Sequence, residues 1–154
     1  IRIRINIAAH LYAVERQLNK CTPHADNGSK LCHTVCIQMR QTPMRKIERQ
    51  MCDAIANEQD WRKDNTEVIN FYNEDKELVV TSVYLHGNLI SEVTNNAVTI
   101  FDGGWRTNTT KSRLNAIINR FCDAFTDGVY QHKGEWFITD DKYVKQFVNG
   151  YTFA

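Results

Sequence analysis

Residues 103–116 read GGWRTNTTKSRLNA, a glycine pair and a polar, basic segment that together lead into a helix. From Leu114 onward, apolar side chains recur at the i, i+3, i+4, i+7 spacing of a helix with one buried face. These side chains are Leu114, Ile117, Ile118, Phe121 and Phe125. Either Thr109 or Thr110 is placed to cap this helix by accepting a hydrogen bond from a free backbone N–H. The stretch predicts a central amphipathic helix against which the rest of the domain packs.

The first turn of this helix carries basic residues where the helix dipole favours acidic ones. Hydroxyls, free backbone N–H groups and two cations converge there, which suits a phosphate or a carboxylate. Upstream, an indole and a guanidinium are placed to stack on or clamp a nucleotide. The predicted anion- or partner-binding residues are Trp105, Arg106, Thr109, Thr110, Lys111, Ser112 and Arg113. The alternative is that Lys111 and Arg113 pair with surface acids while Trp105 fills the edge of the core.

Composition narrows the class of protein. The chain has 154 residues, 42% of them hydrophobic and 24% charged, as is ordinary for one globular domain. A formal net charge of +1 gives no global field for nucleic acid or acidic membranes, so such binding requires a local patch. No stretch approaches a membrane span, and the odd count of five cysteines indicates a reducing, cytosolic compartment.

The pattern of the chain predicts an α+β fold. A helix is expected over 44–60, with Met44, Ile47, Met51 and Ile55 buried and Glu48 on its wet face. Four strands over 67–73, 77–86, 89–93 and 98–101 are expected to form an antiparallel meander, and 129–132 with 135–139 a hairpin. A last short helix is expected to start near Asp140 or Asp141, with Val144, Phe147 and Val148 inward. The result is an antiparallel sheet, meander plus hairpin, with two to three helices packed on it.

The N-terminal third differs from the rest. Residues 1–7 alternate like a strand, residues 8–20 have helical spacing, and residues 21–43 are polar and irregular. Met44 reads like a natural start, so we expect residues 1–43 to be an extension or appendage and residues 44–154 a single α+β domain. The extension holds one set of residues that could bind zinc in a tetrahedron, although its spacing matches no standard zinc finger. The set is Cys21, His24, Cys32 and Cys36. We expect no bound metal and no cofactor.

Signals for catalysis are sparse. His86 and Glu92 lie near strand ends, where a histidine beside a carboxylate could transfer protons. No nucleophile elbow or metal-binding helix accompanies them. A nucleotide-triphosphate loop is excluded because Thr110 stands before Lys111, where that loop requires glycine. The sequence therefore favours a binding protein over an enzyme. Aromatic residues along the strands are mostly expected in the core, with an exposed subset free to stack on bases or meet a protein.

Part of the chain resembles a family of small accessory proteins of tailed bacteriophages, including marine and cyanobacterial phages. The resemblance rests on Met44–Glu48, on Leu85–Asn88, on Gly104-Trp105 followed by Thr109–Ala116, and on Val129–Gln131 with Trp136. It implies a viral origin and expression in the cytoplasm of a host bacterium. We therefore expect a phage accessory protein that binds an anionic partner, either nucleic acid or a host protein, to modulate host or defence functions. The alternatives are an enzyme acting on a small anionic metabolite or nucleotide, and a structural component of the virion.

Overall fold

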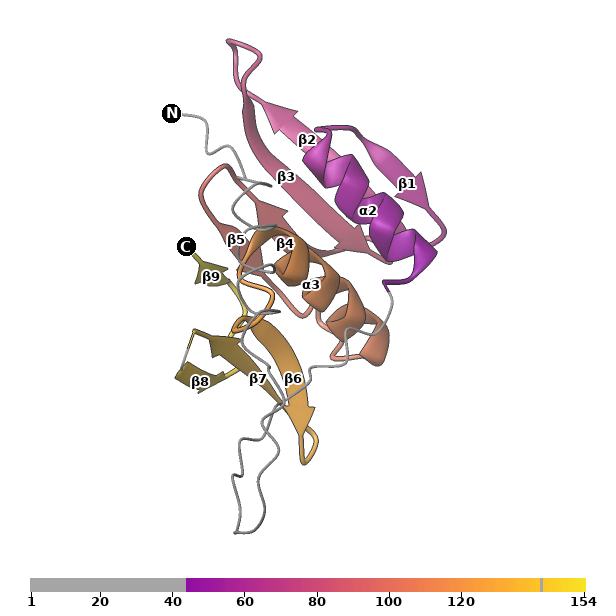
Figure 1. The fold of residues 1–154 in the computed structure, drawn as a ribbon. Coiled ribbons are helices and arrows are strands. Elements are labelled where there is room, and N and C mark those ends of the chain that lie inside the picture. The colour runs from indigo at the N-terminus through magenta and orange to yellow at the C-terminus, as the bar shows by residue number, and fades with distance from the viewer. Residues whose placement is uncertain (1–43, 142) are drawn as a thin grey trace, which may run out of the picture. The chain divides into compact units, whose positions relative to one another are not determined.

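The computed structural model describes residues 44–141 and 143–154, which form two helices and two antiparallel sheets (Figure 1). The helices are α2 (Lys46–Ala56) and α3 (Asn108–Phe121). The six-stranded sheet has the order β1-β2-β3-β4-β5-β9 and the three-stranded sheet the order β6-β7-β8. The strand bounds are β1 Trp61–Lys63, β2 Thr66–Tyr72, β3 Leu78–Leu85, β4 Asn88–Val93, β5 Val98–Ile100, β6 Gly128–His132, β7 Glu135–Asp140, β8 Tyr143–Gln146 and β9 Tyr151–Phe153. The expected α+β class is confirmed.

The core lies between the helices and one face of the six-stranded sheet. Alternation along the strands sends Val68, Val83 and Ile100 to that face, where each is at most 1% exposed. Helix α3 contributes Leu114 and Ile117, both completely buried. The helices contact each other as well as this sheet, and in Figure 1 they lie side by side. Burial of a large aliphatic side chain contributes about 1.5–3 kcal/mol, so each of these residues stabilises the fold.

Both expected long helices are present, with shorter bounds. Helix α2 ends at Ala56, and Glu58 follows it with a left-handed φ of 54°, which ends the helical backbone. Helix α3 is capped by Thr107, whose hydroxyl accepts from the N–H of Thr110 at 3.1 Å. The expected caps Thr109 and Thr110 are therefore wrong, because the extended backbone of Thr107 sets the helix start before them.

Helix α3 also ends earlier than the spacing of its apolar residues predicts. The helix stops at Phe121, so Phe125 lies outside it and is 60% exposed rather than buried. The following turn is held by Asp123, whose carboxylate accepts from the N–H of Phe125 at 2.9 Å. An Asp side chain that bonds the backbone two residues on favours a turn over further helix.

The expected meander forms β2 to β5, and two strands extend it. The three-residue strand β1 pairs with β2, and the C-terminal β9 returns to pair with β5. Each is three residues long, too short for alternation to show in the sequence. Because β9 comes from the chain end, its place in the sheet depends on a long-range contact.

The expected last helix is wrong. Residues Tyr143–Gln146 form strand β8, which pairs with β7. Of the three residues expected to point inward, only Phe147 is buried, whereas Val144 and Val148 are 59% and 61% exposed. Their i, i+3, i+4 spacing is real, but pairing with the neighbouring β7 decides the backbone conformation instead.

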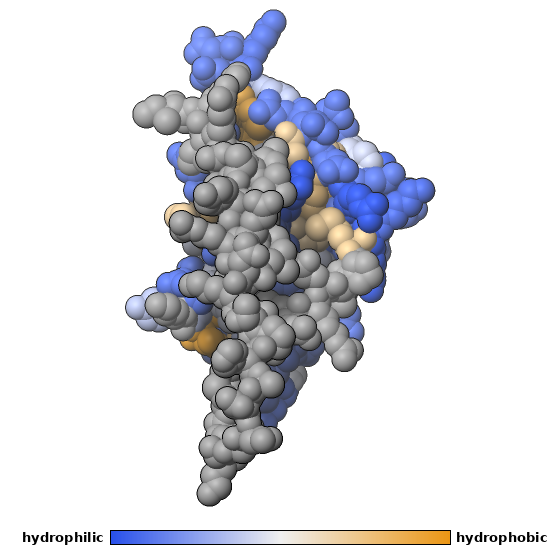
Figure 2. Space-filling model, viewed as in Figure 1, coloured by the Kyte–Doolittle hydropathy of each residue, from blue (hydrophilic) through white to orange (hydrophobic). Residues whose placement is uncertain are grey.

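Three expectations fall on residues outside the described part of the chain: the strand over 1–7, the helix over 8–20 and the irregular segment over 21–43. Within the described part, neither helix has the length and apolar character needed to cross a bilayer. In Figure 2, hydrophilic residues dominate the described surface that is in view, with smaller hydrophobic areas between them.

Candidate interaction site around Trp105

The loop between β5 and α3 is organised by one carboxylate, that of Asp102. Its Oδ1 accepts from the N–H of Gly104 at 2.9 Å, and its Oδ2 accepts from Nε of Arg106 at 3.1 Å. The backbone N–H of Asp102 itself donates to Oδ1 of Asn149 at 2.7 Å, which ties the loop to the segment before β9. The residue is 8% exposed, so these bonds are made in a partly dry environment where they are strong.

The same loop fixes the backbone of Trp105 while leaving its side chain free. The N–H of Trp105 donates to the carbonyl of Asp102 at 3.1 Å. Its own carbonyl accepts from the N–H of Thr107 at 2.9 Å and from the hydroxyl of Thr110 at 2.9 Å. Yet Trp105 is 71% exposed, the largest exposed fraction among the large hydrophobic side chains of the described residues. The alternative that this indole fills the edge of the core is therefore wrong.

Two side chains connect this loop and the start of α3 to the hairpin of β6 and β7. Nη1 of Arg106 lies 3.8 Å from Oε2 of Glu135, and its guanidinium lies 5.5 Å from the ring centroid of Phe147. Nζ of Lys111 donates to Oε1 of Gln131 at 3.2 Å. We call Trp105, Arg106, Lys111, Gln131 and Glu135 the Trp105 surface.

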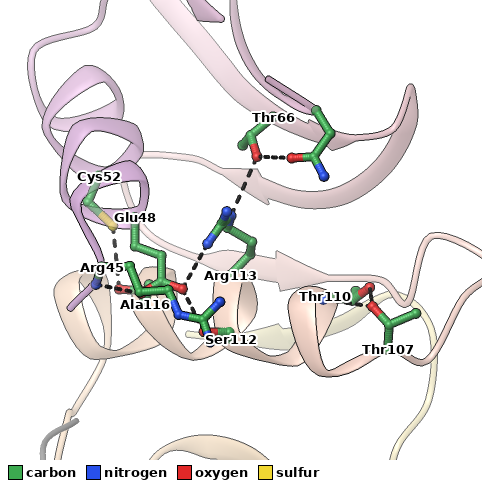
Figure 3. Close-up of polar contacts among 10 residues, drawn as sticks. Arg45, Glu48, Cys52, Thr66, Thr107, Thr110, Ser112, Arg113 and Ala116 are labelled. Carbon is green, nitrogen blue, oxygen red and sulfur yellow. Dashed lines mark hydrogen bonds and ion pairs between the residues drawn. The ribbon is translucent and has the colours of Figure 1, made fainter. Parts of the chain in front are cut away.

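Other residues of the predicted cluster face the interior (Figure 3). Nη1 of Arg113 lies 2.8 Å from Oε1 of Glu48, with side-chain exposures of 5% and 6%. The hydroxyl of Ser112 donates to the same Oε1 at 2.5 Å, and the N–H of Arg45 donates to Oε2 at 3.0 Å. Nε of Arg113 approaches the hydroxyl of Thr66 at 3.4 Å. Glu48 thus joins α2 to α3 from inside, and its expected position on the wet face of α2 is wrong.

The structure accordingly separates the predicted binding residues into two groups. Trp105, Arg106 and Lys111 lie around the loop, while Arg113 and Thr110 are buried and bonded within the domain. Thr109 and Ser112 are half-buried. The sequence does not assign Gln131 or Glu135 to this surface, because their contacts with Lys111 and Arg106 span 20 or more residues of chain.

Comparison with protein families places these observations in context. Residues 44–154 match the profile of the Kyanoviridae Gp96 protein family. The chain belongs to this family. The Trp105 surface and the Glu48–Arg113 pair both lie within the matched residues, and the expected relation to a phage protein family is confirmed. Neither the curated proteins nor the solved structures include a significant match.

In this member of the Kyanoviridae Gp96 family, the two residues proposed for proton transfer lie apart. His86 and Gly87 form the turn between β3 and β4 with φ values of 53° and 78°, and Nε2 of His86 lies 2.8 Å from Nδ2 of Asn65. Glu92 lies on β4 opposite Ser82, four residues beyond Asn88. At about 3.3 Å per residue the separation along the strand is about 13 Å, too far for one proton-transfer site.

Of the cysteines in the described residues, Cys52 is buried and Cys122 is half-buried, and both thiols have little nucleophilic character. Burial raises the pKa of Cys52 to about 12, and burial likewise raises the pKa of Cys122 to about 12. A thiol with such a pKa is not ionised at neutral pH and behaves as a small hydrophobe. Over residues 44–141 and 143–154, no group of three or more His, Cys, Asp or Glu side chains is arranged to hold a metal ion. The candidate zinc ligands Cys21, His24, Cys32 and Cys36 lie outside the described residues.

The two glycines before Trp105 provide a matched pair of substitutions. Gly103 has a φ of +61°, and a Cβ built there would lie 3.1 Å from Cγ2 of Ile90 and 3.3 Å from Cβ of Asn88. Gly104 has a φ of +79° with no heavy atom within 4 Å of its Cβ position. Gly104→Ala should lower the free energy of unfolding by about 1–2 kcal/mol, from backbone strain alone. Gly103→Ala should lower it by more because steric crowding is added. Urea unfolding of both variants checks this, and equal losses would contradict the close approach.

The carboxylate of Asp102 should make stability depend on pH. Burial by itself raises the pKa of this group, but hydrogen bonds from Gly104, Arg106 and Asn149 outweigh burial and hold the pKa below its ordinary value. A lowered folded-state pKa stabilises the fold at pH values above the ordinary pKa of about 4, and the benefit is lost as pH falls through the folded-state pKa.

Asp102→Asn should therefore lower the free energy of unfolding at pH 7 by about 1–2 kcal/mol. The difference in free energy of unfolding between this variant and the original protein should shrink as pH falls through the lowered folded-state pKa of Asp102, where the original carboxylate also becomes protonated. Urea unfolding across this pH range is the measurement. Asp75→Asn, in the exposed turn between β2 and β3, is the control and should show no such trend. If the free energy of unfolding of Asp102→Asn differed from that of the original protein by the same amount at every pH, the lowered pKa of Asp102 would be contradicted.

Proposed function

We propose that this phage protein acts as an accessory factor by binding another protein through the Trp105 surface. The observation that carries the proposal is the combination of a rigid loop backbone with an indole that is 71% exposed. An exposed indole on an ordered backbone suits a role in contact, because its apolar ring and polar N–H are both available to a partner. Trp and Arg are also the side chains most often found at the energetic centre of protein interfaces.

Preorganisation adds to this argument. Three hydrogen bonds fix the backbone of Trp105, and Arg106 is oriented by Asp102, Glu135 and the ring of Phe147. A partner that meets this surface therefore orders few groups on binding, and the entropic cost of association falls. The side chain of Arg106 is 40% exposed, so one face of it remains available to a partner.

The charges around Trp105 favour a protein over a nucleic acid. Phosphate backbones are bound by several unneutralised cations whose counterions are released. Here Arg106 is shared between Asp102 and Glu135, and Arg113 is neutralised inside by Glu48. Acidic residues also outnumber basic ones across residues 44–154. An exposed aromatic side chain beside a shared ion pair and a polar contact matches the anatomy of a protein interface.

Site-specific photocrosslinking tests the proposal. A benzophenone amino acid placed at position 105 should crosslink to a protein in lysate of the host bacterium, and the adduct should be sensitive to protease and resistant to nuclease. The same probe at position 71 is the control, because Phe71 is 46% exposed on the six-stranded sheet. Adducts at both positions alike, or none at 105, would refute the Trp105 surface. Nuclease-sensitive adducts at 105 would show that the partner is nucleic acid.

Truncating the indole tests the proposed binding surface by a measured affinity. Once the crosslinked partner is purified, Trp105→Ala should weaken its affinity by a factor of about 30, the effect of losing about 2 kcal/mol at an interface centre. Phe71→Ala should leave the affinity unchanged. Titration calorimetry of the two variants makes the measurement, and unfolding curves confirm that both remain folded. An unchanged affinity in Trp105→Ala would refute the proposal.

A further inference from the structure

The two edge strands of the three-stranded sheet, β6 and β8, differ in whether their outward backbone groups are hydrogen-bonded. At the β6 edge, the side-chain amide of Asn115 imitates a neighbouring strand. Its Nδ2 donates to the carbonyl of Val129 at 2.8 Å, and its Oδ1 accepts from the N–H of Val129 at 2.8 Å. These bonds satisfy the outward backbone groups of Val129 and close that edge to further strands.

The β8 edge has no such cover among the residues that the structure describes. Strand β8 is last in the order β6-β7-β8, and its four residues Tyr143–Gln146 are all exposed. The N–H of Phe147 donates to the carbonyl of Trp136 on β7, which shows that the backbone groups of Phe147 point toward β7. Backbone groups alternate along a strand, so Tyr143 and Lys145 bond toward β7. Val144 and Gln146 therefore present their N–H and C=O groups outward.

One face of the sheet carries both apolar and polar side chains beside this edge, with Gln146 opposite Phe137 and Val144 opposite Thr139. Tyr130 and Phe137 stack with their ring centroids 5.5 Å apart, on neighbouring strands. Thr139 pairs with Val144 across β7 and β8, which places Val144 on the same face as Phe137. Val144 is 59% exposed and brings an apolar side chain to the open edge. An uncovered edge that carries an exposed apolar side chain is a template for another strand.

We infer that β8 pairs antiparallel with β8 of a second copy of this chain, with the two-fold axis at Val144. The pairing would join two three-stranded sheets into one six-stranded sheet. It is isologous, since the same strand serves both copies, which is the commonest symmetry of soluble oligomers. It goes beyond the proposed function and involves none of the five residues of the Trp105 surface.

The side chains of β8 are self-complementary in this register. Val144 lies opposite Val144 of the second copy, and their outward N–H and C=O groups bond each other as a pair. Tyr143 then lies opposite Lys145 of the second copy, which places a cation beside an aromatic ring. Lys145 already makes such a contact within one chain, with its Nζ 5.1 Å from the ring centroid of Tyr151. A register centred on Lys145 would instead put two like charges opposite each other, which is unfavourable.

The expected dimer depends on concentration. A pair of four-residue strands buries less area than the roughly 1,200–2,000 Å² of a stable interface. Sedimentation velocity over a range of concentrations should show a reversible monomer–dimer equilibrium. Val144→Pro should abolish it, because proline removes an outward N–H but none of the bonds to β7. Val144→Thr, which keeps the N–H and the branched shape, should still dimerise.

Disulfide trapping tests the register independently of how well the proline variant folds. In a chain with Cys21, Cys32 and Cys36 replaced by serine, Val144→Cys should form a covalent dimer under mild oxidation. Paired Cα atoms in such a ladder lie about 5.5 Å apart, within the reach of a disulfide. Val79→Cys, which is 53% exposed on the other sheet, is the control and should crosslink much more slowly. A protein that stays monomeric, a dimer that survives Val144→Pro, or equal crosslinking at both positions would each overturn the inference.

Discussion

Replacing Glu48 with alanine is expected to lower the free energy of unfolding by about 3–5 kcal/mol, measured by urea denaturation. The substitution leaves Arg113 charged and nearly buried without its carboxylate, whose Oε1 lies 2.8 Å from the guanidinium. It also removes the acceptor of the Ser112 hydroxyl and of the backbone N–H of Arg45. Much of the loss is the penalty of an unpaired buried charge rather than the strength of the pair.

A second substitution separates these contributions. Replacing both partners, as Glu48→Leu with Arg113→Met, removes the two charges together and fills the space with apolar atoms. This double variant should recover most of the stability lost in Glu48→Ala, because buried ion pairs are often no better than well-packed apolar residues. A loss below about 1 kcal/mol in Glu48→Ala would show that the pair is solvated rather than buried.

Trp136→Ala is expected to lower the free energy of unfolding by about 3–5 kcal/mol, the usual loss for a large aromatic residue in a core. Trp136 is 1% exposed in β7 and meets Phe147 edge to face, with ring centroids 5.4 Å apart. That contact holds Phe147, the residue that follows β8, against β7. Guanidinium denaturation followed by circular dichroism is the measurement.

Trp136→Phe should be much milder than the alanine variant. Among the described residues, Nε1 of Trp136 is buried and finds no hydrogen-bond acceptor. An unsatisfied buried donor costs about 1–3 kcal/mol, and phenylalanine removes it while keeping the ring that meets Phe147. If Trp136→Phe proved as damaging as Trp136→Ala, the indole N–H would have to be bonded in solution.

Most of the secondary structure was predictable from the sequence because each element carries its own local pattern. The helical spacing from Leu114 to Phe121 is confirmed in α3, and the strands expected over 77–86 and 89–93 form the β3–β4 hairpin. The failures come from short segments. The helical spacing of Val144, Phe147 and Val148 falls on strand β8 and the residues after it, and β1 and β9 are too short to show alternation. In such segments, pairing with a neighbour outweighs local preference.

The candidate interaction residues were predictable as residue types and not as an assembly. An exposed indole next to basic residues was anticipated, and the loop around Trp105 shows it. Whether a basic side chain points to solvent or into the core depends on which residue packs against it from a neighbouring helix or strand. Glu48 on α2 draws Arg113 and Ser112 inward, whereas Gln131 binds Lys111 at the surface.

The sequence by itself indicated the α+β class, because hydrophobic period and turn residues act locally, and its motifs carried the resemblance to a phage family. It also contained a sign of the ion pair, since Glu48 lies three residues before Met51 and Arg113 four before Ile117, each on a buried helix face. Only the tertiary structure decided that these two charges meet and that Trp105 remains outside. A buried charge is tolerated only opposite its partner, and Glu48 and Arg113 are 65 residues apart in the chain.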